Sequence, residues 1–104
     1  MKYLSLTLYV RMGEDGHTSS VFPDRKDLLT AAEPYAVSVN PYNKTVRICM
    51  TGKPMIEAKH TCFLVAGENK CSILKKILDK EQEDIYPASY IWHHARMPKL
   101  YASL

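Results

Sequence analysis

The sequence predicts an α/β domain in which helices cover a largely parallel sheet. Apolar runs with the two-residue period of strands alternate with segments whose apolar residues have helical spacing. The order strand, glycine-containing loop, helix occurs at residues 10–27 and again at residues 65–76. Ligands of layered α/β domains bind beyond the carboxyl ends of the strands, where such loops gather. The 104 residues are the length of one modest domain, so we treat 1–104 as a single unit.

The boundaries of the elements follow from alternation, capping residues and prolines. Asp24 is a suitable cap for a helix that Pro34 ends, and Pro54 suits the first turn of a short helix. Pro87 and Pro98 indicate breaks near the end of the chain. In chain order we expect a strand over 4–10, a loop over 11–23, a helix over 24–32, strands over 35–39 and 44–50 around a turn, a short helix over 54–58, a strand over 60–67, a helix over 68–82 and a strand over 99–104.

Composition argues against several classes of function. The net charge is +3 and the basic residues are scattered, whereas a nucleic-acid-binding surface needs a basic patch. Cys49, Cys62 and Cys71 are an odd number without metal-ligand spacing, which favours reduced thiols in a cytoplasmic protein. No apolar run reaches the length of a membrane span. His93 and His94 are adjacent, so we expect a polar loop there. We therefore expect no metal, cofactor, nucleic-acid or membrane partner.

The loop at residues 11–23, RMGEDGHTSSVFP, concentrates reactive side chains. Gly13 and Gly16 allow a tight turn, and Asp15 lies two positions before His17. A neutral imidazole takes a proton from water near neutral pH, and a nearby carboxylate stabilises the resulting imidazolium. The hydroxyl residues at 18–20 are candidates to cap the following helix. From spacing alone, a surface turn with an idle histidine is the more common alternative. A serine nucleophile elbow and a phosphate-binding P-loop are both absent.

The same loop resembles the signature of the 6-phosphogluconolactonase family, in which a strand runs into G-x-x-D-G-H-[TS]-[AS]-S-[LI]-F-P. Here the segment reads GEDGHTSSVFP. The resemblance continues through VRICMTGKPMIEAKHTCFLVAGENKCSILKKIL and IYPASYI, so it covers nearly the whole chain. Glucosamine-6-phosphate deaminases share the D-G-H core, but their motif continues with Ile-Ala-Phe-Asn-Glu-Pro. Residues 18–23 lack the Asn-Glu pair, which makes the resemblance to the lactonases the closer one.

The resemblance implies a Rossmann-like layered sheet with flanking helices. It also implies hydrolysis of 6-phospho-D-glucono-1,5-lactone in the oxidative pentose phosphate pathway, with neither metal nor covalent intermediate. By the resemblance, His17 is the general base and Asp15 supports it. By the same resemblance, the residues that would contact the substrate are Gly13, Glu14, Gly16, Arg47 and Lys70. Lys70 and Arg47 would face the phosphate.

The chain departs from the family pattern in two places. Arg11 stands where the family usually has a glycine, so it would crowd the site or pair with Glu14. The motif also lies close to the start of the sequence, whereas family members carry a preceding half. We therefore expect residues 1–104 to be the C-terminal portion of a 6-phosphogluconolactonase-like domain, truncated relative to the family. An exposed sheet edge favours a homodimer. The alternative to an enzyme is a catalytically inactive fragment that binds sugar phosphates.

Overall fold

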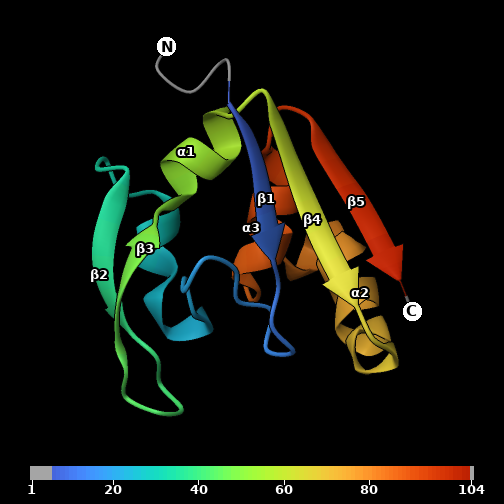
Figure 1. Cartoon of the computed structure of the whole chain (residues 1–104), viewed down its shortest axis with the longest axis horizontal. Coiled ribbons are helices and arrows are strands. Elements are labelled where there is room, and N and C mark those ends of the chain that lie inside the picture. The colour runs from blue at the N-terminus through green and yellow to red at the C-terminus, as the bar shows by residue number, and fades with distance from the viewer. Residues whose placement is uncertain (1–5, 104) are drawn as a thin grey trace.

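The structure is a computed structural model that describes residues 6–103 (Figure 1). Its strands carry the period-two apolar pattern, and its helices lie in the segments between them. In chain order the elements are β1 (Thr7–Arg11), the 3₁₀ helix η1 (Pro23–Leu29), β2 (Tyr35–Val39), β3 (Val46–Met50), α1 (Gly52–Glu57), β4 (His60–Ala66), the 3₁₀ helix η2 (Glu68–Lys70), α2 (Cys71–Leu78), the 3₁₀ helix η3 (Lys80–Gln82), α3 (Pro87–His94) and β5 (Pro98–Ser103).

The main sheet has three parallel strands in the order β1-β4-β5. Phe63 of β4 lies opposite Val10 of β1 and Leu100 of β5, so β4 is the central strand. β2 and β3 pair antiparallel as a separate hairpin, with Ser38 opposite Arg47. The expected parallel sheet is therefore confirmed for three strands, while the hairpin stands apart from it.

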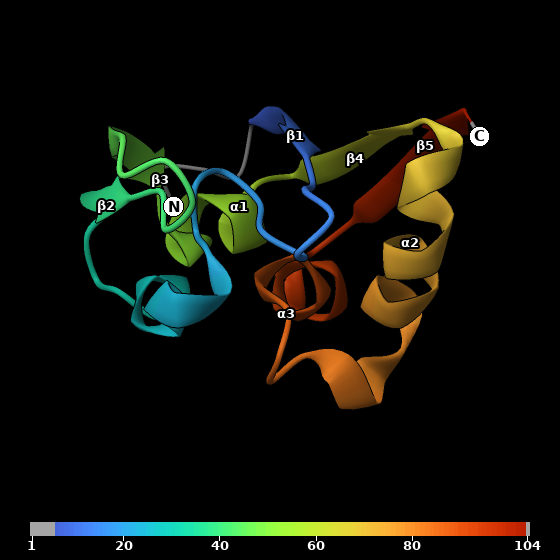
Figure 2. The same ribbon diagram turned by 90° about the horizontal axis from the view of Figure 1, so that it is seen from below.

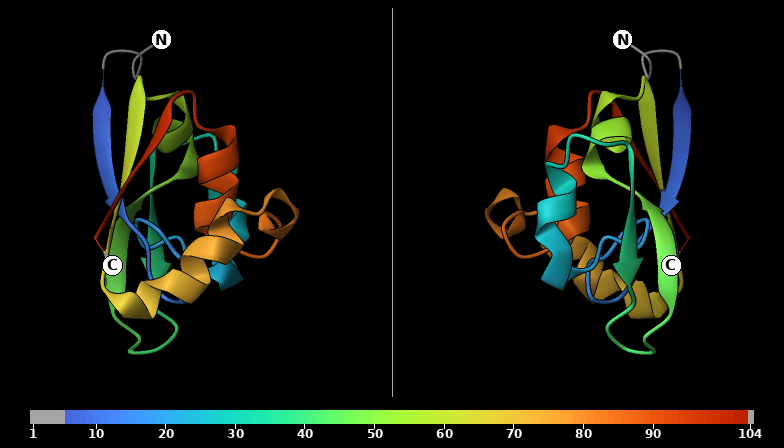
Figure 3. Two further views of the ribbon diagram at one scale, coloured as in Figure 1. Left: turned by 90° about the vertical axis from the view of Figure 1, so that its right-hand side faces the viewer. Right: turned by 90° about the vertical axis from the view of Figure 1, so that its left-hand side faces the viewer.

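Helices α2 and α3 cover one face of the main sheet and leave the other face open (Figure 3). Alternation along the strands turns Val10, Phe63 and Val65 toward the helices, where they are buried. The opposite face carries Tyr9 and Tyr101, which are 67% and 55% exposed. Together the layers form the Rossmann-like arrangement that the sequence predicts, with helices on one side only within residues 6–103.

The core lies between the main sheet and the helices. Phe63 contacts Trp92 of α3 edge to face at a ring distance of 5.7 Å. Met55, Ile77 and Ile91 bring α1, α2 and α3 to this cluster and are fully buried. In α2 the apolar stripe is buried at Leu74 and Ile77, as the helical spacing predicts.

Residues 87–94 form helix α3, and the polar loop expected around His93 and His94 is wrong. Pro87 stands at the first turn, where its fixed φ suits a helix and its missing N–H is not needed. Ala88 and Ile91 then turn a buried face to the core. Within the helix, the Nδ1 atom of His93 lies 2.8 Å from the Ser89 carbonyl oxygen.

Other boundaries differ in smaller ways. The helix expected over 68–82 is interrupted at Asp79, whose backbone is extended and whose carboxylate accepts the Glu81 N–H. The segment expected as a helix over 24–32 is the 3₁₀ helix η1, kinked at Arg25. The third and the last strands begin at Val46 and Pro98. Positions 4 and 5 of the first expected strand and position 104 of the last lie outside the described residues.

Candidate active site

The reactive loop joins the carboxyl end of β1 to η1 and closes into a tight turn. The N–H of Gly16 donates to the Gly13 carbonyl at 3.0 Å, and the N–H of Gly13 donates to the His17 carbonyl at 2.9 Å. Seen from this edge of the sheet, the loop lies between the hairpin and α2 (Figure 2). The site therefore forms beyond the carboxyl ends of the parallel strands, as expected for this class of fold.

At both glycines of this turn, a Cβ atom would collide with a neighbouring side chain. A Cβ atom at Gly13 would lie 2.1 Å from Cε1 of His17, because the imidazole ring lies directly against the Gly13 backbone. Gly16 has a φ of 84°, and a Cβ there would lie 2.5 Å from Cδ1 of Tyr86. Gly13 thus makes room for the His17 ring, and Gly16 makes room for the Tyr86 ring and supplies the positive φ of the turn.

The hydroxyl residues after His17 fix the loop to its neighbours. Thr18 donates its hydroxyl to the Arg11 carbonyl at 2.7 Å. The hydroxyl of Ser19 lies 3.1 Å from both the N–H and the carbonyl oxygen of Met50, at the end of β3. Ser38 of β2 donates to the Ser20 carbonyl at 2.9 Å. The expectation that these hydroxyls cap the next helix is wrong, since η1 has no side-chain cap and the Thr18 and Ser19 hydroxyls bind Arg11 of β1 and Met50 of β3 instead.

Asp15 and His17 form a hydrogen-bonded pair within the turn. Oδ1 of Asp15 lies 2.5 Å from Nδ1 of His17 and also accepts the His17 backbone N–H at 3.0 Å. An ionised carboxylate only accepts hydrogen bonds, so Nδ1 carries the proton and Nε2 of the neutral ring has the free lone pair. Of the described residues, none makes a hydrogen bond to Nε2. In a histidine that acts as a general base, a carboxylate bonded to one ring nitrogen leaves the other nitrogen free to take a proton.

Tyr42, in the turn between β2 and β3, completes this pair and was missed by the sequence reasoning. Its hydroxyl donates to Oδ2 of Asp15 at 2.5 Å. Burial raises the pKa of Asp15, but the hydrogen bonds from Tyr42 and His17 outweigh burial and hold that pKa below its ordinary value. The same hydrogen bond raises the pKa of the Tyr42 phenol. The only signal at Tyr42 was turn chemistry, which does not reveal a partner 27 residues away.

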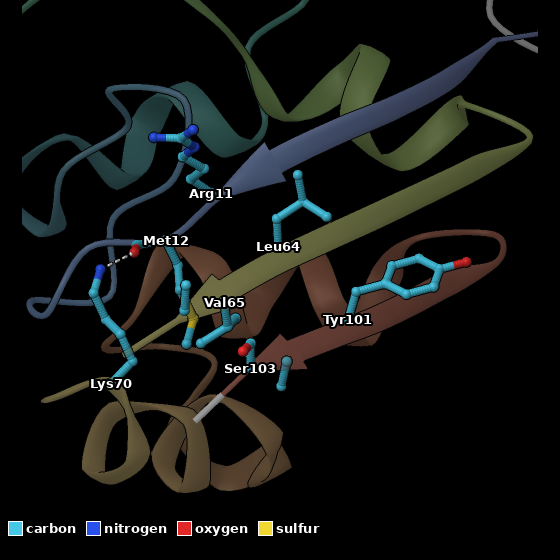
Figure 4. A pocket seen from close by; sticks show the side chains of 9 residues that line it. Arg11, Met12, Leu64, Val65, Lys70, Tyr101 and Ser103 are labelled. Atoms are coloured by element: carbon cyan, nitrogen blue, oxygen red, sulfur yellow. Dashed lines mark hydrogen bonds between the residues drawn. The ribbon is translucent and has the colours of Figure 1, made fainter. Parts of the chain in front are cut away.

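Lys70 reaches the same site from the end of the 3₁₀ helix η2, which follows β4. Its ammonium group donates to the Met12 carbonyl at 2.6 Å (Figure 4). Lys70 and His17 both line a hollow of about 470 Å³ beside the end of β1. A second hollow, of about 530 Å³, extends from Lys70 over the ends of β4 and β5 toward Tyr101. The structure thus brings the base candidate and the predicted phosphate ligand Lys70 to a single cavity.

The remaining candidates lie around this cavity in different ways. Arg11, the last residue of β1, lines both hollows. It forms no ion pair with Glu14 within residues 6–103, and the Glu14 carboxylate accepts a hydrogen bond from the side chain of Asn69. Arg47 lies on the exposed hairpin opposite Ser38 and is not among the residues that line either hollow. The structure brings Lys70, but not Arg47, to His17.

Within residues 6–103, no three histidine, cysteine, aspartate or glutamate side chains are grouped closely enough to hold a metal ion. The helices in this part of the chain are also too short or too polar to cross a membrane.

Comparison with known proteins agrees with this arrangement. The sequence model of the family described as glucosamine-6-phosphate isomerases/6-phosphogluconolactonase matches residues 7–100. The 6-phosphogluconolactonase of Aggregatibacter actinomycetemcomitans is 39% identical over 87 residues, covering 78% of this chain and 35% of that protein. The human 6-phosphogluconolactonase is 33% identical over 88 residues, covering 84% of this chain and 34% of the relative.

Solved structures extend the similarity to the fold. The crystal structure of 6-phosphogluconolactonase from Leishmania guyanensis superposes with a TM-score of 0.77 at 28% identity, covering 95% of this chain and 39% of that one. The chain spans about a third of the length of the curated relatives and matches their C-terminal part. With its D-G-H turn at the end of β1 and its match over residues 7–100, the chain belongs to the glucosamine-6-phosphate isomerase/6-phosphogluconolactonase family.

Proposed function

We propose that the chain hydrolyses 6-phospho-D-glucono-1,5-lactone to 6-phosphogluconate by way of a water molecule that His17 activates. The observation that carries this proposal is that His17, held at Nδ1 by Asp15, lines a hollow that Lys70 also lines. The lactone is an activated ester with an anionic phosphate, so it requires a base at its carbonyl and a cation at its phosphate. The family also supports this substrate, since relatives named 6-phosphogluconolactonase match most of the chain.

The reaction needs one proton to move through His17. Nε2 takes a proton from water as the water oxygen bonds to the lactone carbonyl carbon, and the carbonyl π electrons move to the oxygen. The tetrahedral intermediate then re-forms the carbonyl and breaks its bond to the ring oxygen. The imidazolium returns the proton to that oxygen, which becomes the hydroxyl of the open acid. Asp15 stabilises the imidazolium between these steps, because its carboxylate contacts Nδ1.

We assign the substrate phosphate to Lys70. A lysine ammonium has three protons, and the bond to Met12 uses one of them. Arg47 lies outside the hollow, so we assign it no phosphate contact in this arrangement. Gly13 and Gly16 act by leaving space, because their N–H groups already donate within the loop. Glu14 acts by tying this loop to Asn69.

Two other functions remain as alternatives within the same family. An amino-sugar phosphate deaminase would use the same D-G-H turn, but the residues after His17 lack the acid of that motif. A fragment that binds sugar phosphates without catalysis is the second, since the chain has about a third of the relatives' length. As a lactonase, the chain would serve the oxidative pentose phosphate pathway in the cytoplasm.

A substrate comparison separates these functions. The purified chain is assayed with 6-phosphogluconolactone, corrected for spontaneous hydrolysis, and with glucosamine 6-phosphate. A lactonase accelerates only the first reaction and a deaminase only the second. Binding of 6-phosphogluconate without acceleration of either reaction identifies the non-catalytic fragment and contradicts the proposal.

We further propose that the chain associates with a second copy through its open sheet edge. β1 has one neighbour in the main sheet, so the backbone of its other side is unpaired among the described strands. An unpaired edge with exposed aromatic side chains such as Tyr9 favours pairing with another chain.

A further inference from the structure

The hairpin formed by β2 and β3 contributes a side chain to the candidate active site. Both oxygens of the Asp15 carboxylate have partners. Oδ1 accepts both N–H groups of His17, and Oδ2 accepts the hydroxyl of Tyr42 at 2.5 Å. We propose that Tyr42 is a positioning residue, which holds the Asp15 carboxylate in the orientation that fixes His17 with its proton on Nδ1 and its lone pair on Nε2. This role rests on the proposed function of His17 as the general base.

Tyr42 lies in a turn that several hydrogen bonds stabilise, although its ring is exposed. The side-chain oxygen of Asn40 accepts the Tyr42 backbone N–H at 2.8 Å, and the Asn40 N–H donates to the Thr45 carbonyl at 2.9 Å. The Lys44 N–H closes the turn on the Asn40 carbonyl at 2.8 Å, with Lys44 itself in the left-handed region at a φ of 63°. These bonds restrict the backbone at Tyr42, so the ordering of the phenol does not depend on Asp15 alone.

Aromatic contacts connect the Tyr42 ring to the His17 ring. Phe22 lies edge to face with Tyr42 at a ring distance of 6.3 Å and lies 4.6 Å from the His17 ring. Phe22 is buried, so it forms a fixed support between the two polar rings. The Tyr42 hydroxyl therefore binds Oδ2 of Asp15 and the His17 imidazole binds Oδ1. Both rings contact the same phenylalanine, Phe22.

Because the Asp15 carboxylate is ionised, the tautomer of His17 depends on Tyr42. Hydrogen bonds from Tyr42 and His17 keep the pKa of Asp15 below its ordinary value despite burial, so near neutral pH the carboxylate only accepts. With Oδ2 held by the phenol, Oδ1 remains directed at Nδ1. Without the hydroxyl, water replaces it at Oδ2, and the carboxylate gains freedom to turn away from the ring. The neutral imidazole then populates the tautomer with its proton on Nε2, which cannot accept a proton from water at that atom.

The test compares Tyr42→Phe with Tyr35→Phe in the same hairpin. Tyr42→Phe removes only the hydroxyl and keeps the ring beside Phe22. Tyr35 is an exposed tyrosine of β2 whose hydroxyl makes no hydrogen bond with the described residues. Imidazole ¹⁵N shifts report the tautomer, and a ¹³C titration of Asp15 reports its pKa. The chain has four histidines, so each imidazole can be assigned.

We expect the Nε2–H tautomer of His17 to increase and the pKa of Asp15 to rise in Tyr42→Phe, with neither change in Tyr35→Phe. An unchanged His17 tautomer and an unchanged Asp15 pKa in Tyr42→Phe would overturn the proposal. Neither measurement requires turnover, so both decide the role of Tyr42 even if the wild-type chain fails to hydrolyse the lactone.

The kinetic part of the test separates positioning from binding. We expect Tyr42→Phe to lower kcat about threefold to tenfold, the effect of one hydrogen bond, and to leave KM unchanged. A rise in KM at unchanged kcat would overturn the positioning role and place Tyr42 against the substrate instead. Absence of lactone hydrolysis by the wild-type chain would contradict the proposed function alone.

Discussion

The Nδ1 atom of His17 lies 2.5 Å from Oδ1 of Asp15, although only one residue separates the two in the chain. The turn between them brings the carboxylate within hydrogen-bond distance of the backbone N–H of His17 as well as of its Nδ1 atom. Asp15 therefore fixes the orientation of the imidazole through two bonds, one to the backbone and one to the side chain.

Replacing Asp15 by asparagine should lower kcat about 10²-fold, because the imidazolium loses its stabilising charge and the tautomer is no longer fixed. A side-chain amide can donate to Nδ1 as well as accept from it, so the ring takes the wrong tautomer in part of the population. Steady-state kinetics with the lactone, corrected for spontaneous hydrolysis, measure this effect. Unchanged kcat in Asp15→Asn would contradict the assignment of Asp15.

The pH dependence of folding stability tests the same residue without turnover. The pKa of Asp15 in the folded chain lies below its ordinary value, so the ionised carboxylate stabilises the fold above the ordinary pKa. That contribution is lost as the pH falls through the lowered pKa. Urea unfolding should therefore find wild type more stable than Asp15→Asn at pH 7, with the difference shrinking in strong acid. A difference independent of pH would show that the ionisation of Asp15 does not stabilise the fold.

Gly13→Ala should remove activity while the fold persists. The added Cβ would meet the His17 ring at 2.1 Å, so the imidazole must move, and a displacement of about 1 Å lowers rates about 10²-fold. Gly52→Ala is the matched control, because its Cβ would meet the Leu29 carbonyl oxygen and not the imidazole. We expect the control to lower the melting temperature and to leave the His17 ring signals in place. Full activity in Gly13→Ala would mean that the ring position seen here is not the working one.

Lys70→Ala should raise KM for the phosphorylated lactone about tenfold or more, since a charge-assisted hydrogen bond contributes about 1.5–3 kcal/mol. The exposed Lys75 of α2 has the same charge but lies outside both hollows, so Lys75→Ala is the control. Unphosphorylated gluconolactone gives a second comparison, because its KM should not depend on Lys70. An equal effect of the two lysine substitutions would place the phosphate elsewhere.

Tyr9→Lys should weaken self-association of the chain. Tyr9 is 67% exposed on the edge strand β1, and a lysine on an edge strand opposes pairing with another chain. Light scattering at working concentration should give a dimer for wild type and a monomer for Tyr9→Lys. A monodisperse wild-type monomer would refute the dimer.

Much of the site could be predicted from the sequence because its parts are local or follow from parallel strands. Asp15 and His17 share one turn, so their contact needs no long-range packing. Lys70 comes soon after the carboxyl end of β4, and the loop that carries His17 follows the carboxyl end of β1. The carboxyl ends of neighbouring parallel strands lie at one edge of the sheet. The approach of Lys70 to His17 was therefore foreseeable once both strands were recognised.

The parts that were missed depend on tertiary contacts or on weak local signals. Tyr42 meets Asp15 through the packing of the hairpin against the loop, which the Ser19 and Ser38 hydroxyls join. Helix α3 begins with a proline and contains Tyr90, Ile91 and Trp92, residue types that favour strands when taken alone. Packing of Ala88 and Ile91 into the core overrides that preference.

The central claim is that His17 is the base of a lactone hydrolase, and the most direct measurement compares wild type with His17→Ala. Both are assayed with 6-phosphogluconolactone at matched concentration above the spontaneous rate, with His94→Ala as a control for loss of an exposed histidine. We expect wild type and His94→Ala to accelerate hydrolysis and His17→Ala to lose about 10²-fold or more in kcat. Equal rates for wild type and His17→Ala would contradict the claim.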